Sequence, residues 1–184
     1  MFLKTKNQKL KTNFGFTLIE VLVVITIIGI LTVGVFVPYN FYSNIAKVRV
    51  SKEIINQTIN EARSNAFGLQ TRSNKKNVNI GLVFEKGKKE IKMLTYPFNY
   101  SGSIVGEATG DIELLRLIKL EDQVELSKID PDQIIIAYFE APNGDLFFYK
   151  SGSKSPLDLT GVVMTVGYRG TTSGILSKEV EIKK

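Results

Sequence analysis

The residues with the clearest chemical potential lie close together near the start of the chain. They are the junction Gly15–Phe16 and the carboxylate of Glu20, which is the only ionisable side chain between Phe16 and Val37. A carboxylate inside a bilayer costs about 2.5–3.5 kcal/mol even on insertion scales, so it is rarely there without a partner. A cut between Gly15 and Phe16 would create an α-amino group, which is a cationic partner for Glu20. This chemistry predicts a self-assembling subunit.

The apolar run that holds Glu20 is long enough to cross a membrane. As a helix, residues 16–37 would measure about 33 Å, against about 30 Å for the hydrocarbon core of a bilayer. The residues before the run carry four lysines and no acidic side chain: Lys4, Lys6, Lys9 and Lys11. Because basic flanks stay cytoplasmic, we expect everything after about Tyr39 to lie outside the cytoplasmic membrane. These lysines also supply most of the net charge of +6, since the rest of the chain has 20 basic and 18 acidic residues.

The sequence around this site resembles a known signal. The stretch Gly15-Phe-Thr-Leu-Ile-Glu20-Val-Leu-Val-Val-Ile-Thr-Ile-Ile-Gly-Ile-Leu is similar to the class III signal of type IV prepilins and of the pseudopilins of type II secretion systems. The resemblance implies cleavage after Gly15 by a membrane-embedded prepilin peptidase, which also methylates the amine of Phe16. It further implies that Glu20 contacts the amine of a neighbouring subunit during assembly.

Two other kinds of N-terminal signal fit this sequence less well. An ordinary secretory signal has a shorter apolar region followed by small residues at the cut, and no such site follows this run. A plain signal anchor fits the length of the run, but it leaves Glu20 and the abrupt start at Gly15–Phe16 unexplained. The prepilin interpretation accounts for both features.

Four segments follow from this interpretation, and they predict an α+β, pilin-like fold. We expect a cleaved basic leader at 1–15, a transmembrane part of the N-terminal helix at 16–37, an amphipathic continuation of that helix at 38–72, and a globular β-rich domain at 73–184. The continuation is indicated by apolar residues at steps of three and four, which would pack one helix face on the domain. They are Ile45, Val48, Ile55, Ile59, Ala62, Ala66 and Leu69, with Ser51 in one gap.

The globular domain reads as a series of antiparallel hairpins separated by turn residues. Residues 97–110, rich in Gly and Ser, are expected to form a loop. The four predicted strand pairs are 78–84 with 90–96, 112–120 with 124–129, 134–140 with 146–150, and 162–168 with 176–182.

The composition argues against catalysis. The chain has no Cys, which excludes thiolate catalysis and Cys-based metal sites, and no His, which removes the commonest general base and metal ligand. Ser151 and Lys154 match one Ser-x-x-Lys motif, but its companion motifs are not intact, and a solvated turn explains them better. Asp130-Pro131-Asp132 supplies too few oxygen ligands for calcium and also reads as a turn. The sequence therefore predicts no cofactor and no bound metal.

Three classes of function remain open: a structural pilin or pseudopilin subunit, a filament-tip module that binds DNA or a surface ligand, and, remotely, a signal-anchored enzyme. Phosphate contacts in the second class would come from cations near the end of the chain, although Glu179 and Glu181 interrupt them. Those cations are Arg169, Lys178, Lys183 and Lys184.

The globular domain also resembles, more weakly, the H-type pseudopilins and related minor pilins, through Phe139-Glu-Ala-Pro142-Asn-Gly144, Phe147 and Thr165-Val-Gly-Tyr168. The expected partners are prepilin peptidase, other subunits and the cytoplasmic membrane, with nucleic acid a weaker alternative. The expected location is a single pass through the cytoplasmic membrane and then a filament at the cell surface or in the periplasm.

Overall fold

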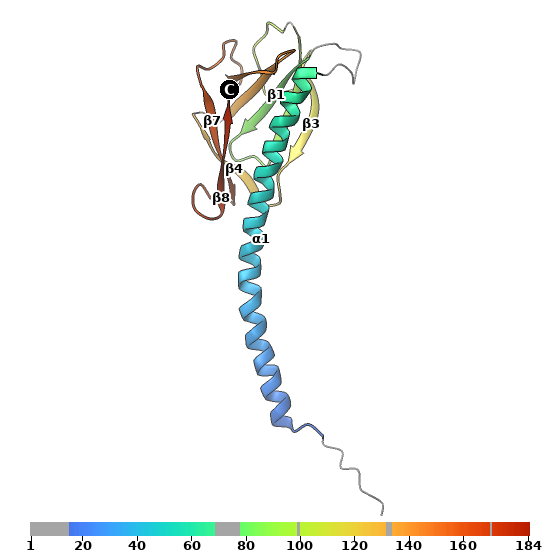
Figure 1. The fold of residues 1–184 in the computed structure, drawn as a ribbon, viewed down its shortest axis with the longest axis vertical. Helices are drawn as coiled ribbons and strands as arrows, with labels where there is room; N and C mark the ends of the chain where they lie inside the picture. The colour runs from blue at the N-terminus through green and yellow to red at the C-terminus, as the bar shows by residue number, and fades with distance from the viewer. Residues whose placement is uncertain (1–14, 69–77, 99, 132–133, 170) are drawn as a thin grey trace, which may run out of the picture. The chain divides into compact units, whose positions relative to one another are not determined.

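A computed structural model describes residues 15–68, 78–98, 100–131, 134–169 and 171–184 (Figure 1). The chain divides into two compact units, residues 1–41 and residues 42–184. One long helix, α1 (Leu18–Gly68), contributes to both units and remains helical through Pro38. In the first unit α1 is apolar on all sides. In the second unit it is amphipathic and is one layer of a folded domain.

After α1, the described residues of the second unit form two antiparallel sheets joined by loops. The five-stranded sheet has the order β3-β2-β1-β5-β6, and the three-stranded sheet has the order β4-β7-β8. The strands are β1 (Val78–Glu85), β2 (Glu90–Pro97), β3 (Glu113–Lys119), β4 (Val124–Asp130), β5 (Ile134–Glu140), β6 (Asp145–Lys150), β7 (Gly161–Tyr168) and β8 (Ser177–Lys183).

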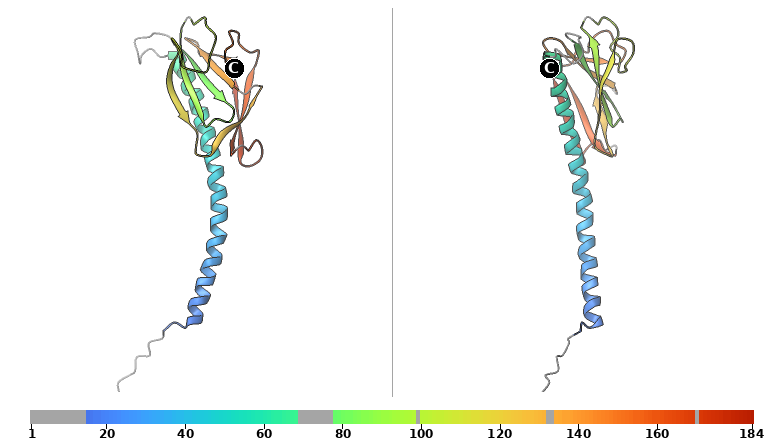
Figure 2. Two further views of the ribbon diagram at one scale, coloured as in Figure 1. Left: turned by 180° about the vertical axis from the view of Figure 1, so that it is seen from behind. Right: turned by 90° about the vertical axis from the view of Figure 1, so that its right-hand side faces the viewer.

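The second part of α1 packs on both sheets through one stripe of side chains (Figure 2). Val48, Ile55 and Ala62 are fully buried and share a hydrophobic cluster with residues from each of the strands β1 to β8. Ser51 interrupts the stripe, and its hydroxyl accepts a hydrogen bond from the backbone N–H of Glu121 at 3.1 Å. Because of this hydrogen bond, the buried hydroxyl of Ser51 is not left without a partner, and a polar residue is tolerated in the stripe.

The face of the five-stranded sheet that is turned away from α1 has a smaller core of its own. Tyr96, Tyr138 and Ile136 on this face pack under the loop between β2 and β3, with Ile104 and Ile112 from that loop. Tyr96 anchors the loop, since its hydroxyl donates a hydrogen bond to the backbone oxygen of Val105 at 2.6 Å. These contacts fix the described part of the loop, residues 100–112, against the sheet.

The predicted α+β fold, with a long N-terminal helix on antiparallel sheets, is confirmed. Three of the four predicted hairpins are also confirmed: β1 pairs with β2, β5 with β6, and β7 with β8. The turn in the first hairpin places Gly87 at a φ of 79°, a conformation that glycine adopts without steric cost. Of the loop predicted at 97–110, Pro97 instead ends β2, and the described residues 98 and 100–110 lie outside the named strands.

The prediction of a hairpin between residues 112–120 and 124–129 is wrong. β3 pairs with β2 at the edge of the larger sheet, whereas β4 pairs with β7 in the smaller one. The turn between them carries the chain from one sheet to the other, and Gln123 takes a φ of 65° there. Gln123 is held by its side-chain oxygen, which accepts hydrogen bonds from Arg169 at 2.9 Å and from the Tyr168 hydroxyl. Because Gln123 and Arg169 are far apart in the chain, the local sequence pattern does not predict this contact.

Several sequence predictions fall outside the described residues. They include the leader and its four lysines, Leu69 and the helix end predicted at residue 72, the side chain of Val37, and Asp132.

Candidate processing and assembly site

The first turn of α1 is closed by a reciprocal pair of hydrogen bonds between Thr17 and Glu20. The backbone N–H of Glu20 donates to the Thr17 hydroxyl oxygen at 3.3 Å, and the backbone N–H of Thr17 donates to Glu20 Oε2 at 2.8 Å. The Thr17 hydroxyl also donates to Glu20 Oε2, at 2.9 Å. This arrangement is a capping box, which satisfies two backbone donors that a helix start would otherwise leave unpaired.

The capping box matters more here than at the start of a soluble helix. In hydrocarbon no water is present to satisfy the free N–H groups of the first turn, so each must find an internal partner. Glu20 therefore has a local role that the sequence analysis did not assign to it. Thr17 was missed altogether, although the spacing Thr17-Leu-Ile-Glu20 is the sequence signature of this cap.

The junction before the cap is open. A side chain built at Gly15 would meet nothing within 4 Å, and Phe16 is 87% exposed. Residue 15 is not part of α1, which begins at Leu18. The described residues thus present an accessible, non-helical segment immediately ahead of a capped helix, which is the form in which a peptide bond can be reached by a peptidase.

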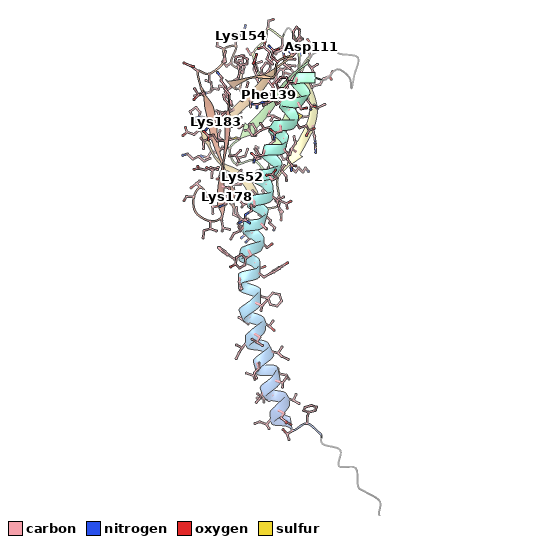
Figure 3. The ribbon with its side chains drawn as sticks, viewed as in Figure 1. Lys52, Asp111, Phe139, Lys154, Lys178 and Lys183 are labelled. Carbon is pink, nitrogen blue, oxygen red and sulfur yellow. The ribbon has the colours of Figure 1, made fainter. Side chains whose placement is uncertain are left out.

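Beyond the cap, the first unit exposes apolar side chains around the whole helix (Figure 3). Ile25, for example, is 65% exposed. Two hydroxyls in this stretch are satisfied internally: Thr26 donates to the Leu22 backbone oxygen at 2.8 Å, and Thr32 to that of Ile28 at 2.6 Å. By length and composition this helix can cross a membrane. The hydroxyls of both threonines in the apolar stretch therefore have a partner within the helix.

Residues 10–36 match the family model described as the prokaryotic N-terminal methylation motif. The chain carries the class III signal of a pilin or pseudopilin precursor. The match covers the junction, the capping box and most of the apolar run. Comparisons with curated proteins and with solved structures gave no match. The resemblance stated from the sequence is confirmed at this level, and it implies processing by prepilin peptidase and assembly with other pilin-like subunits.

In this pilin-like precursor the structure brings Glu20 together with Thr17. Cleavage at Gly15–Phe16, methylation of Phe16 and the contact of Glu20 with another subunit stay predictions. The apolar helix indicates membrane anchoring, and the motif indicates a structural protein of the pilin kind. Among the described residues, no cluster of three or more His, Cys, Asp or Glu side chains could hold a metal ion.

The residues considered for other functions have structural contacts. The Ser151 hydroxyl accepts a hydrogen bond from the backbone N–H of Gly106 at 3.3 Å, and so holds the loop between β2 and β3. Lys183 forms an ion pair with Glu181 at 3.1 Å, Arg169 binds Gln123, and the Lys184 ammonium lies 5.6 Å from the centroid of the Phe147 ring. Three of the four candidate phosphate contacts are thus engaged within the chain.

Proposed function

We propose that this chain is a minor subunit of a type IV pilus or of a type II secretion pseudopilus, cut between Gly15 and Phe16 and methylated on Phe16. The observation that carries the proposal is the methylation motif over residues 10–36, with a lone carboxylate in an apolar helix directly after the junction. The weaker likeness of the globular unit to H-type pseudopilins and related minor pilins supports the minor class. The domain boundaries follow from the same proposal, with a leader at 1–15 and a membrane segment at 16–37.

Assembly in this proposal depends on Glu20. Cleavage leaves a cationic amine on Phe16, and methylation preserves its charge. The amine and Glu20 are only four residues apart in the same chain, so an internal pair is the alternative. In a bundle of staggered helices, however, Glu20 of one subunit can meet the amine of its neighbour, and the pair neutralises two charges that lipid solvates poorly. Thr17 would hold the Glu20 side chain in place, because one carboxylate oxygen accepts both of its hydrogen bonds.

The proposed orientation places the N-terminus inside and the globular unit outside the cytoplasmic membrane. It rests on the lysines of the leader, because positively charged flanks are retained on the cytoplasmic side. Protease added to spheroplasts should then digest the strand domain. Complete protection of that domain in intact spheroplasts, with digestion after lysis, would reverse the orientation.

Intact-mass analysis of the protein from its native membrane tests the processing step. We expect loss of residues 1–15 and one added methyl group on Phe16. Gly15→Val should block the cut, because a branched side chain prevents close approach of the backbone to a peptidase site. Gly29→Val is the matched control, since a side chain at Gly29 also meets nothing within 4 Å and lies away from the junction. Full-length chain in assembled filaments would contradict the proposal.

A further inference from the structure

The outer face of the five-stranded sheet holds a pocket that the proposed function does not use. It has a volume of about 170 Å³ and lies between the loop that follows β2 and the loop that follows β6. We call it the tyrosine pocket and define it by six of its lining residues: Tyr100, Tyr138, Glu140, Phe147, Tyr149 and Lys154. Lys154 lies at the end of the globular unit that is far from Lys52 and Lys178 (Figure 3).

The two loops that border the tyrosine pocket are tied together. The backbone N–H of Ile104 donates to the Ser153 oxygen at 2.8 Å, and that of Gly152 donates to the Ile104 oxygen at 2.7 Å. The Tyr100 ring folds back over its own loop, and this is possible because residue 102 is glycine: a Cβ there would lie 2.5 Å from the Tyr100 hydroxyl oxygen. The pocket is therefore formed in advance, which reduces the conformational entropy that a ligand would have to remove.

The rings of the pocket also hold one another. Tyr138 contacts Tyr149 edge to face, with centroids 5.5 Å apart, and Tyr96 contacts both Tyr138 and Tyr100 in the same way at 5.3 and 5.6 Å. Edge-to-face pairs of this kind are worth about 0.5–1.5 kcal/mol beyond their buried area. The hydroxyls of the lining tyrosines are thus presented at fixed positions.

The polar groups of the tyrosine pocket combine donors and acceptors. The carboxylate of Glu140 accepts hydrogen bonds only, and the ammonium of Lys154 donates only. Burial raises the pKa of Tyr138, and burial followed by the charge of Glu140 raises the pKa of Tyr149. Both phenols therefore stay protonated near neutral pH and can donate as well as accept. One anion and one cation leave the lining without net charge.

We propose that the tyrosine pocket binds a neutral pyranose sugar. Each sugar hydroxyl both donates and accepts, so it matches a lining that offers Glu140, Lys154 and phenol hydroxyls together. The partly buried Tyr149 ring offers an apolar face for the C–H side of the sugar ring, whereas the Phe147 ring beside it already has the Lys184 ammonium 5.6 Å from its centroid. The volume is below the range of about 300–1,000 Å³ for drug-sized ligands, which limits the occupant to about one ring. Lys154 would repel a cationic ligand, and Glu140 would repel an anionic one.

Saturation-transfer NMR on the full-length protein, in a detergent without a sugar headgroup, tests this proposal. The probes are methyl β-D-glucopyranoside, methyl β-D-galactopyranoside and their 2-acetamido analogues, with the open-chain polyol sorbitol as the control ligand. We expect saturation of the ring protons of at least one pyranoside, with a Kd of about 1 mM, and none for sorbitol.

Substitutions in the tyrosine pocket test whether the sugar binds there. Glu140→Gln and Lys154→Met should each raise the Kd about tenfold, because each removes a charge-assisted hydrogen bond. Glu179→Gln, an exposed carboxylate on β8 in the other sheet, should leave the Kd unchanged. Tyrosine circular dichroism shows that each variant is folded.

Three results would overturn the proposal. The first is no transfer to any of the four pyranosides from folded protein. The second is equal transfer to sorbitol, or an affinity that neither pocket variant changes. The third is binding of tetramethylammonium without binding of any pyranoside, which would instead make the pocket a cation site.

Discussion

The two parts of α1 have the same secondary structure, but their apolar side chains contact different surroundings. Between Leu18 and Phe36 large apolar residues are exposed on every side, and Ile25 is a typical case. Between Val48 and Ala66 the buried residues recur on one stripe, where Ile55 is 0% exposed. An all-round apolar helix needs lipid or other helices, whereas a striped helix needs one folded partner. The contrast shows that apolar content alone does not define a core; the spacing of the apolar residues does.

The largest expected effect is that of removing the charge of Glu20, which lies in the first part of the helix. This change should impair the assembly of subunits into filaments. Glu20→Gln keeps the shape and the capping geometry but cannot neutralise the amine of a neighbouring subunit. We expect normal cleavage and membrane insertion, and a decrease of more than about tenfold in incorporation into filaments.

Filament yield and cross-linking between subunits measure this effect. Incorporation at the wild-type level would reject the role assigned to Glu20. Thr17→Val separates the two roles of the carboxylate, since this variant weakens the cap and leaves the charge in place.

Truncation of one isoleucine in each part of α1 tests the comparison directly. Ile55→Ala should lower the free energy of unfolding of the globular unit by about 2–5 kcal/mol, because it leaves a cavity in the main core. Ile25→Ala, the same chemical change at an exposed position, should leave that free energy unchanged. Denaturant unfolding followed by circular dichroism measures both. Equal losses from the two substitutions would remove the distinction between the parts.

Alkaline pH should destabilise the globular unit through its buried phenols. Burial raises the pKa of both Tyr96 and Tyr138 above the ordinary value of 10.0. Their contribution to stability is therefore complete below about pH 10 and is lost as the pH rises above it. With both groups titrating in the unfolded state, the slope approaches about 2.7 kcal/mol per pH unit.

Unfolding measured between pH 8 and pH 12 gives this slope. Tyr96→Phe should reduce it by about half, at the expense of the hydrogen bond to Val105. A slope that Tyr96→Phe leaves unchanged would show that these phenols are not responsible.

Ser51, a polar residue in the buried stripe, gives the smallest effect. Ser51→Ala leaves the backbone N–H of Glu121 without its partner and should cost about 1–3 kcal/mol. Ser64→Ala, on the exposed side of the same helix, should change the stability by a few tenths of a kcal/mol at most. If the two variants are equally stable, the turn at Glu121 does not depend on α1.

Most of the site and much of the fold could be predicted from local patterns. The junction Gly15–Phe16, the apolar run, the stripe on α1 and three of the hairpins all depend on residues that are close in the chain. The capping box belongs to the same class, because Thr17 and Glu20 are one helical turn apart. Its signature, Thr17-Leu-Ile-Glu20, is present in the sequence, but the charge of Glu20 by itself predicts a cationic partner and not Thr17.

The features that local patterns could not predict depend on residues far apart in the chain. The sequences of β3 and β4 suit a hairpin, but β3 pairs with β2 and β4 pairs with β7. The hydrogen bond between Arg169 and Gln123 stabilises the turn by which the chain passes from one sheet to the other. The tyrosine pocket likewise joins Tyr100 to Lys154 through the bridge between Ile104 and Ser153. Backbone geometry and periodicity act over a few residues, so they specify helices, turns and the processing signal. Which strand edges meet, and which loops enclose a pocket, follows from packing the whole domain at once.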